Sequence, residues 1–265
     1  MAQGVYAPHS AFRNALNFLD GDRLLCLVSS SVGAGPANIV FAGPLPAADA
    51  PLEVSPEGLR WGGACFPFSG VPAYRSSLDG NVPRREGVEA NLGALLKWLP
   101  ANAPRRSLSF LLGGKPCRGT VFDRQSREWI GAACSELFDN DLAAGVRLIR
   151  GAGPGLTPSG DDLLCGALAA LDAASRLSGR DLTGRRDEVY RNAVGGNPFS
   201  NAFLGFARRG LYGERFKALA AAILCGEPAE VEREAGRALL FGATSGADWL
   251  TGFGLAMHRW RDLWS

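Results

Sequence analysis

The stretch Gly151-Ala-Gly-Pro-Gly-Leu-Thr-Pro-Ser-Gly-Asp-Asp162 comes directly before an apolar run from Leu163 to Leu171. Gly153 and Gly155 permit backbone angles that other residues disfavour, and Pro154 stiffens the chain between them. A rigid loop followed by an apolar run is typical of a helix that starts at a fixed point. The stretch therefore predicts a loop that leads into a helix.

The residues that follow in this loop are those that favour a helix N-terminus. Thr157 or Ser159 is placed to cap the helix, and Pro158 suits its first position. Asp161 and Asp162 fall in the first turn, where the helix dipole favours acidic residues. Hydroxyls, backbone N–H groups and two carboxylates thus converge at one point, which indicates either an elaborate helix start or a binding site.

A second copy of the motif lies 86 residues downstream of the first. Ser159-Gly-Asp-Asp-Leu-Leu-Cys-Gly166 and Ser245-Gly-Ala-Asp-Trp-Leu-Thr-Gly252 share the form S-G-x-D-x-L-x-G. Thr157 and Thr244 precede the two copies, and an apolar helix is expected after each one. In one interpretation both are capped helices that pack closely through their glycines. In the other, both N-termini face one cavity and bind an anion.

The carboxylates of the two copies allow a further alternative. Asp162 and Asp248 would be neutralised if they held a divalent cation between them. We expect the two copies to converge, because ordinary capping requires neither the glycine after the serine nor the aspartate three residues on.

The fold class predicted from the pattern is α+β. Short apolar segments separated by Gly and Pro predict a β-rich domain over residues 1–85, and apolar residues at helical spacing predict a helical domain over residues 86–265 that carries both motifs. Strands are expected at Leu24–Ser30, Ile39–Phe41, Leu52–Val54, Leu59–Trp61, Ala64–Phe68 and Val71–Tyr74. Helices are expected at residues 10–19, 88–99, 134–149 (broken near Asn140 and Gly145), 158–177, 186–194, 200–209, 214–224, 228–240 and 247–264, and Ser107–Leu112 fits either.

The bulk composition excludes several classes of protein. A net charge of +2 over 265 residues gives no electrostatic argument for binding nucleic acid. The absence of a long apolar run argues against a membrane span, and the interrupted N-terminus shows no signal peptide. The six cysteines form no C-x-x-C pair, which favours free thiols in the cytoplasm over a zinc site or disulfides. They are Cys26, Cys65, Cys117, Cys134, Cys165 and Cys225.

Other candidate residues are weaker. Ser200 and Asn201 follow the Gly-rich turn Gly195–Pro198; Ser200 is placed to cap a helix, and both residues could line the same cavity as the motifs. The stretch Gly113–Gly119 lacks the G-K-[ST] of a phosphate-binding loop. Cys165 is interpreted as a buried structural thiol. His9 and His258 are the only histidines, so few residues are available for a mechanism based on histidine.

The two motifs resemble those of one bacterial family of unknown function. Gly153-Pro-Gly-Leu-Thr-Pro-Ser-Gly-Asp-Asp162 and Thr244-Ser-Gly-Ala-Asp248 carry the resemblance, and the pattern His9-Ser-x-Phe and the helix from Asn201 to Gly210 extend it along the chain. The family includes the AllH subunit of oxamate carbamoyltransferase. The chain departs from the family at Ala243-Thr244, where a histidine is expected, and at Asn197-Pro198, where hydroxyl residues are common.

The resemblance implies an enzyme subunit that works with partners. In allantoin catabolism, the complex transfers a carbamoyl group between oxalurate and phosphate, and its companion subunits resemble acyl-CoA synthetase chains. Helix N-termini and hydroxyls suit the stabilisation of the charge that develops in such a transfer. Contacts to a small anionic substrate would come from Gly153, Gly155, Thr157, Ser159, Gly160, Ser200, Asn201, Thr244, Ser245 and Gly246, and the catalytic carboxylates would be Asp161, Asp162 and Asp248.

Three hypotheses follow. The chain is a carbamoyltransferase-like subunit, a small-molecule-binding or assembly subunit without chemistry of its own, or a metal-dependent hydrolase built on the three aspartates. No cofactor is firmly implied, and Mg²⁺ is the candidate if the aspartates bind a cation. Acyl-CoA-synthetase-like subunits or further copies of the chain are the expected protein partners, whereas nucleic acid and membrane are not expected.

Overall fold

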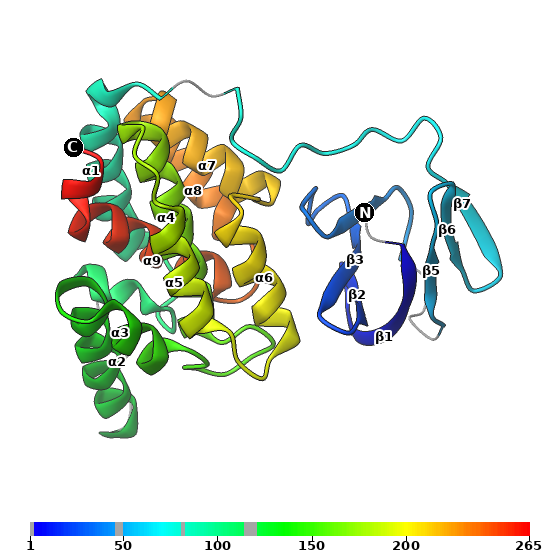
Figure 1. Cartoon of the computed structure of the whole chain (residues 1–265), viewed down its shortest axis with the longest axis horizontal. Helices are drawn as coiled ribbons and strands as arrows, with labels where there is room; N and C mark the ends of the chain where they lie inside the picture. Colours follow the sequence, from blue (N-terminus) through cyan, green and yellow to red (C-terminus); the bar gives the residue numbers. More distant parts are fainter. Residues whose placement is uncertain (1–2, 46–49, 81–82, 114–120) are drawn as a thin grey trace. The chain divides into compact units, whose positions relative to one another are not determined.

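The computed structural model describes residues 3–45, 50–80, 83–113 and 121–265. The chain forms two compact units. The first comprises residues 1–77 together with 212–214, and the second comprises residues 78–211 and 215–265. The first unit is built on a β-sheet and the second is largely helical, so the predicted α+β class is confirmed (Figure 1). Cys117 and most of the stretch Gly113–Gly119 lie outside the described residues.

One seven-stranded sheet forms the first unit, with strand order β4-β3-β2-β1-β5-β6-β7. Neighbouring strands are antiparallel except β3 and β4, which are parallel. Phe18 packs edge-on against Trp61 in the core of this unit, with ring centroids 5.9 Å apart. The strands are β1 (Gly4–Phe12), β2 (Ala15–Asp20), β3 (Arg23–Ser29), β4 (Asn38–Phe41), β5 (Leu52–Val54), β6 (Gly58–Trp61) and β7 (Ala64–Pro67).

The predicted helix over residues 10–19 is wrong, because this segment forms a hairpin of β1 and β2. Phe12 pairs with Ala15 across a two-residue turn. The apolar residues fit helical spacing, but Leu16 and Phe18 also alternate at the period of a strand, and both are buried in the sheet core. Pairing with β3 on the other side of β2 favours the strand.

The other predicted strands are confirmed with one exception. The segment Val71–Tyr74 is not a strand, although it has an apolar composition. Val71 is exposed, and Pro72 has no N–H to donate to a neighbouring strand.

The second unit contains the predicted helices. The helix predicted to end at residue 99 continues through Pro100 as α1. The break predicted near Gly145 is wrong, because Gly145 lies inside α3, where a methyl group would overlap the backbone of Leu137. The segment Leu108–Leu112 is a 3-10 helix, η1. The helices are α1 (Arg85–Asn102), α2 (Val121–Asp139), α3 (Leu142–Ile149), α4 (Ser159–Ser178), α5 (Thr183–Ala193), α6 (Pro198–Arg208), α7 (Glu214–Cys225), α8 (Pro228–Ala238) and α9 (Ser245–Arg259), followed by the 3-10 helix η2 (Arg261–Leu263).

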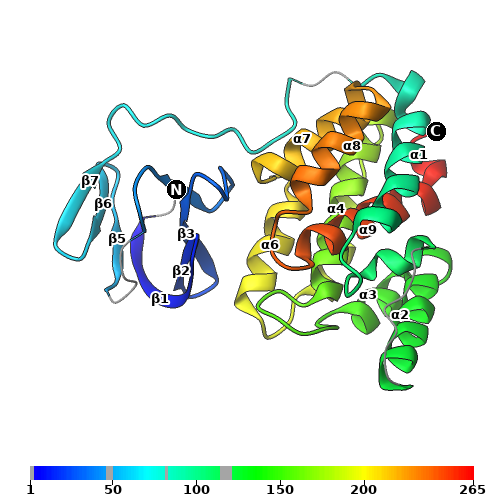
Figure 2. The same ribbon diagram turned by 180° about the vertical axis from the view of Figure 1, so that it is seen from behind.

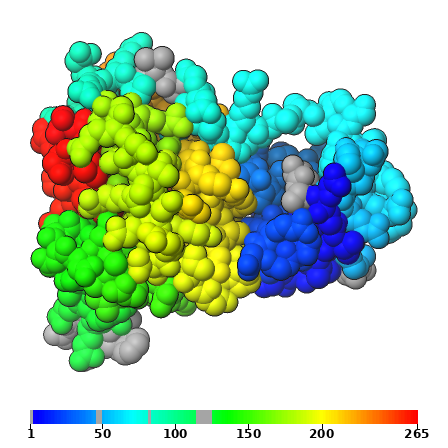
Figure 3. All heavy atoms as spheres, in the orientation of Figure 1, coloured from blue at the N-terminus to red at the C-terminus, as the bar shows by residue number. Residues whose placement is uncertain are grey.

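The packing of α4 against α9 organises the second unit. The two helices lie side by side in both ribbon views (Figures 1 and 2), and their contact is the most extensive between helices in the described part of the unit. Nearly every residue of both helices is buried. Other helices cover this pair, and the segments from α2 to α6, coloured green to yellow, make up much of this unit's surface in the view of Figure 3. The two motifs therefore begin the two core helices of the unit.

Two further properties concern the described residues alone. None of the helices seen in the structure is long and apolar enough to cross a membrane. The five cysteines in these ranges are free thiols, and Cys165 is buried on α4 as expected.

Candidate functional site

The loop before α4 is held by glycines in the left-handed region of backbone conformation. Gly153 and Gly155 have φ angles of 105° and 113°, which favour glycine. The helix begins at Ser159, and Pro158 occupies the cap position without any side-chain cap. The prediction that Thr157 or Ser159 caps α4 is therefore wrong. Their hydroxyls instead serve contacts to the second motif.

The backbone N–H groups in the first turn of α4 already have acceptors. Gly160 N–H donates to Ala152 O (2.8 Å), and the Asp161 and Asp162 N–H groups donate to Pro158 O (2.9 and 3.1 Å). These three N–H groups are thus used to fold the loop. Recognition of a ligand here would depend on side chains and on the helix dipole.

The start of α9 repeats this construction. Gly242 also adopts a left-handed conformation (φ 63°), and a methyl group there would press on Ser245, as one at Gly153 would press on Ser159. Gly246 N–H donates to Phe241 O (2.9 Å), which corresponds to the bond made by Gly160 N–H. Thr244 is the cap residue, but its side chain does not cap the helix. Each motif is therefore a loop, a left-handed glycine and a serine at the first helical position.

The two motifs meet through their hydroxyls and carboxylates. The Thr157 hydroxyl donates to Asp162 Oδ2 (3.2 Å) and lies 3.2 Å from Ser245 Oγ. The Ser245 hydroxyl also lowers the pKa of Asp162, and the Ser159 hydroxyl lowers that of Asp248. Each serine thus serves the aspartate of the other motif. We call Thr157, Ser159, Asp162, Ser245 and Asp248 the paired-motif centre.

Burial raises the pKa of Asp162 well above its usual value. Hydrogen bonds from Ser245 and Thr157 act in the opposite direction, whereas the negative charges of Asp248 and Asp161 raise the pKa further. Asp162 therefore holds a proton more readily than an exposed aspartate does.

Asp248 is fully buried. Burial raises its pKa to about 6, and the Leu108 N–H and the hydroxyls of Ser159 and Thr244 counteract this effect. Oδ1 accepts the Leu108 N–H at 2.6 Å, while Oδ2 is buried without a partner in hydrogen-bond geometry among the described residues. An unpaired buried carboxylate oxygen is costly, so Asp248 favours a proton or a polar neighbour.

Glycines bring the two helices close enough for these contacts. A methyl group at Gly166 would overlap the carbonyl oxygen of Trp249, and one at Gly252 would overlap the carbonyl oxygen of Leu163. Leu163 and Trp249 occupy corresponding positions in the two motifs, so the contact is reciprocal. The repeated glycine that ends S-G-x-D-x-L-x-G is thus explained by helix packing.

The first turn of α4 presents two faces. Ser159 and Asp162, three residues apart, face the second motif, whereas Pro158 and Asp161 line a cavity on the neighbouring face. Asp161 is buried, and its Oδ1 accepts the Gly151 N–H at 2.7 Å. Two consecutive aspartates therefore have two different surroundings.

The cavity has a volume of about 310 Å³ and lies between the starts of α4 and α6. We call it the α4–α6 cavity. Arg150 supplies a positive charge, and its Nη1 donates to Val194 O (3.2 Å) and Asn192 O (3.4 Å). The lining residues are Arg150, Gly151, Pro158, Asp161, Ala193, Gly195, Gly196, Asn197, Ser200 and Asn201.

Asparagines fix the α6 side of the cavity. Asn197 caps α6 by accepting the N–H groups of Phe199 and Ser200 (3.0 and 3.3 Å), and it donates to Leu156 O (2.8 Å). Asn201 bonds to both the N–H and the O of Gly195. The prediction that Ser200 caps this helix is therefore wrong. Its Oγ is buried and has no hydrogen-bond partner in the described structure.

The predicted site residues thus divide into two neighbouring groups. Ser200, Asn201 and Asp161 line the α4–α6 cavity, whereas Gly153, Thr157, Ser159, Gly160, Asp162, Thr244, Ser245, Gly246 and Asp248 build the paired-motif centre and its two loops. Gly155 shapes the loop before α4 but is not part of the cavity lining. Their roles in binding or catalysis stay predictions.

Sequence reasoning missed two contributors. Arg150 directly precedes the Gly-rich loop, and this position was an available signal. The Leu108 N–H that bonds to Asp248 lies 140 residues away along the chain, and nothing in the sequence marks it.

The predicted metal site consists of Asp161, Asp162 and Asp248. Over the described ranges, no group of three His, Cys, Asp or Glu side chains is arranged to hold a metal ion. Asp161 faces the α4–α6 cavity while Asp162 faces α9, which accounts for this result.

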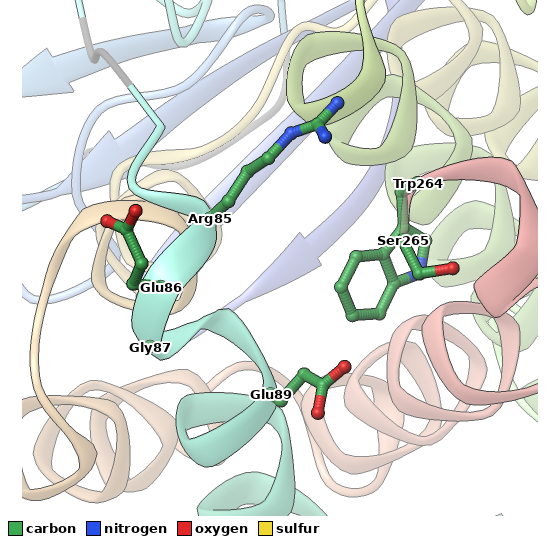
Figure 4. Close-up of a pocket in the computed structure, with 6 residues that line it drawn as sticks. All are labelled: Arg85, Glu86, Gly87, Glu89, Trp264 and Ser265. Atoms are coloured by element: carbon green, nitrogen blue, oxygen red, sulfur yellow. The ribbon is translucent and has the colours of Figure 1, made fainter.

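A second cavity, of about 350 Å³, lies between the start of α1 and the residues after η2 (Figure 4). Three of its polar side chains are already engaged within the chain. Arg85 Nε donates to Leu177 O (3.0 Å), Glu89 pairs with Arg261, and Trp264 Nε1 donates to Met257 O (2.9 Å). This cavity therefore offers a ligand fewer unengaged polar groups than the α4–α6 cavity does.

The segment from residue 149 to residue 257 contains both motifs and all the residues of the α4–α6 cavity. It matches the family described as oxamate carbamoyltransferase subunit AllH. This part of the chain is AllH-like. The resemblance inferred from the motifs is thereby confirmed, and the AllH match begins at the last residue of α3 and ends within α9. No curated protein and no solved structure matches the chain.

Proposed function

We propose that this chain is a subunit of a carbamoyltransferase-like enzyme that acts on a small anionic amide of the oxamate or oxalurate type. The AllH match supports the class of enzyme. The observation that carries the proposal is the paired-motif centre, where two helix starts hold two buried carboxyl groups, Asp162 and Asp248, of raised pKa. The enzyme would act in the cytoplasm, in the catabolism of nitrogen compounds or purine-derived compounds such as allantoin.

The chemistry of this transfer requires proton movement at one nitrogen. When phosphate attacks the carbamoyl carbon of oxalurate, a C–O bond forms and the C–N bond breaks, and the leaving nitrogen takes up a proton to give oxamate. A carboxyl group with a pKa near neutrality is suited to supply or accept that proton. In this proposal Asp161 contacts the substrate, and Asp162 and Asp248 act behind it by holding protons and orienting the hydroxyls of Ser159 and Ser245.

The charge balance of the site supports an anionic substrate. Arg150 brings a guanidinium to the α4–α6 cavity, and the starts of α4 and α6 both adjoin it. The positive ends of two helix dipoles and one arginine favour a negative group there. The carboxylate of Asp161 alone would oppose it, so Arg150 is the residue that makes the site compatible with an anion.

The test is carbamoyl transfer by the chain together with its companion subunits. The complex should convert oxalurate and phosphate to oxamate and carbamoyl phosphate, and Asp161→Asn should lower kcat by about a hundredfold, because a substrate that loses this contact is misplaced for the transfer. Arg147→Gln is a matched control, because Arg147 is exposed on α3 and is not part of the cavity lining. A complex that turns over equally with Asp161→Asn would contradict the proposal.

A second candidate is a binding or assembly subunit that performs no chemistry. The observation that favours it is the packing role of the repeated glycines, since Gly166 and Gly252 serve the contact between α4 and α9. In that case, partner subunits such as acyl-CoA-synthetase-like chains or further copies of this chain would carry the reaction. Variants of Asp161 would then change ligand affinity or assembly while kcat stayed constant.

A metal-dependent hydrolase built on Asp161, Asp162 and Asp248 is the third candidate. No observation in the structure favours it over the other two. Calorimetric titration of the chain with Mg²⁺ tests it, since a hydrolase of this kind requires saturable binding that Asp162→Asn abolishes. A heat of titration that does not saturate would exclude the hydrolase, so that only the two preceding candidates would remain.

A further inference from the structure

We infer that the α4–α6 cavity is the subsite for a small carboxylate that also carries an amide or ureido N–H₂ group. The inference rests on the proposed function for its choice of probe. Beyond that function, it names the place where the ligand binds and the residues that select it. Arg150, Asp161 and Ser200 are the three side chains that carry it.

Arg150 has donors to spare. Its Nη1 is anchored to the carbonyl groups of Val194 and Asn192, and the other N–H groups of the guanidinium have no partner among the described residues. Arg150 also forms no ion pair with Asp161 in the described structure, although both line the cavity. A guanidinium held at one edge and open at the other is suited to bind a carboxylate.

Asp161 has an acceptor to spare. Oδ1 is occupied by the Gly151 N–H at 2.7 Å, and no bond is found for Oδ2 in the described part of the chain. A carboxylate oxygen accepts hydrogen bonds and donates none, so its natural partner is an N–H group. One cavity thus offers a cation and an anion at once, and a ligand that satisfies both carries a carboxylate and an N–H₂ group.

Ser200 provides an independent indication that a ligand belongs here. It is 3% exposed, it lines the cavity, and its Oγ is buried with no hydrogen-bond partner in the described residues. Buried hydroxyls are nearly always hydrogen-bonded, because an unsatisfied one is destabilising. The neighbouring asparagines cannot satisfy it, since Asn197 and Asn201 are engaged with the backbone. A polar group of the ligand would do so.

The internal repeat points to the same cavity. The residue that corresponds to Asp161 in the second motif is Ala247, which is buried. The aspartate that faces the other helix occurs in both motifs, as Asp162 and Asp248. A carboxylate is therefore present at this position only in the motif that borders the cavity, which is expected if Asp161 serves a ligand rather than the architecture.

The probe is oxamate, which carries one carboxylate and one amide N–H₂ group, titrated calorimetrically into the full chain in phosphate-free buffer. We expect saturable binding, which Arg150→Gln should weaken by about tenfold or more and Ser200→Ala by about threefold, as is usual on loss of a charged or a neutral hydrogen bond. Ser200→Ala should leave the melting temperature unchanged, because the hydroxyl has no partner in the fold. Arg147→Gln is the control and should bind oxamate as the wild type does.

Selectivity gives a second readout. Oxalate places a second carboxylate where Asp161 lies, and oxamide lacks the carboxylate for Arg150, so both should bind more weakly than oxamate. Asp161→Asn should narrow or reverse the preference for oxamate over oxalate. Asparagine keeps an acceptor for the Gly151 N–H, so this variant should fold, and circular dichroism checks that it does.

The outcomes separate this inference from the proposed function. No saturable binding of oxamate, or binding that either Arg150→Gln or Ser200→Ala leaves unchanged, would overturn the subsite. If oxamate binds through these residues while the assembled complex performs no carbamoyl transfer, the subsite stands and the proposed function fails. If the complex performs carbamoyl transfer but Arg150→Gln binds oxamate as tightly as the wild type does, the subsite is wrong and the proposed function stands.

Discussion

The two motifs share one construction and differ at one chemical position. In both, a helix ends, a loop with a left-handed glycine follows, and a serine opens a core helix whose aspartate lies beside the other motif. The first motif adds Asp161 and a loop of nine residues, 150–158, where the second has Ala247 and a loop of six, 239–244. The α4–α6 cavity lies at the first motif.

This difference separates architecture from ligand binding. Features present in both copies, such as Gly166 with Gly252 and Asp162 with Asp248, lie where α4 meets α9. Features present in one copy, such as Arg150 and Asp161, border the cavity. Variants at shared positions should therefore affect stability, whereas variants at unshared positions should affect binding.

The largest effect is expected when the second motif is given the acid of the first. Ala247→Asp would bury a carboxylate in the first turn of α9, where the wild-type residue is 1% exposed. We expect a loss of about 4 kcal/mol in the free energy of unfolding, since the charge would lack a partner. Urea denaturation measures this loss.

The matched control for that substitution is Ala229→Asp. Ala229 is exposed in the first turn of α8, where the helix dipole favours an acid as it does in α9. This variant should be neutral or slightly stabilised. Equal effects of the two substitutions would show that the buried face of the second motif tolerates a charge. That result would contradict the proposed difference between the two motifs.

The shared glycines should give the next largest effect. Gly166→Ala and Gly252→Ala each place a methyl group on a carbonyl oxygen of the facing helix, and we expect each to destabilise the fold by about 3 kcal/mol. Gly93→Ala is the control: Gly93 lies within α1 with open space around it, so alanine should stabilise by about 1 kcal/mol. Thermal or urea unfolding measures the stability of the three variants. Widely different losses of stability for Gly166→Ala and Gly252→Ala would contradict the reciprocal packing.

Asp248→Asn should change how stability depends on pH. The pKa of Asp248 rises from 3.8 in the unfolded chain to about 6 in the folded one, so the folded state holds its proton more tightly. This group therefore lowers stability as the pH rises from about 4 to 6, by about 3 kcal/mol in total. The free energy of unfolding of Asp248→Asn minus that of the wild type should therefore be larger at pH 7 than at pH 4, by about that amount. A stability difference that stays constant across this range would contradict the buried, ionisable state of Asp248.

The smallest effect is expected at Thr157. Thr157→Val keeps the shape but removes the hydroxyl that contacts both Asp162 and Ser245, at a cost of about 1 kcal/mol. Thr183→Val, at an exposed position at the start of α5, should have less effect. If both valine variants behave alike in urea, the hydroxyl does not link the two motifs.

Much of the fold could be predicted because its signals are local. The periodicity of α4 and α9 and the turn residues between strands are read from adjacent residues. The hairpin of β1 and β2 could not be separated from a helix, because Phe12, Leu16 and Leu19 fit one period and Leu16 and Phe18 fit the other. Pairing with β3 determines the outcome, and such pairing is a tertiary effect.

The site was predictable in part for the same reason. The repeat identified Ser159 with Asp162 and Ser245 with Asp248, and these residues do lie together. The capping role assigned to the serines was wrong, because both occupy the first helical position and Pro158 and Thr244 stand at the caps. The division of Asp161 from Asp162 depends on the direction each side chain takes around the helix, which requires the position of α9.

The most direct test of a single paired-motif centre is a double-mutant cycle on Asp162 and Asp248 at pH 7, measured as the free energy of unfolding. Each negative charge raises the energy of the other, so the double variant Asp162→Asn with Asp248→Asn should gain less stability than the sum of the single variants, by more than about 0.5 kcal/mol. The pair Asp162→Asn and Asp187→Asn should be additive, since Asp187 pairs with Arg208 and shares no partner with Asp162. Additivity of Asp162 and Asp248 within about 0.3 kcal/mol would contradict the single centre.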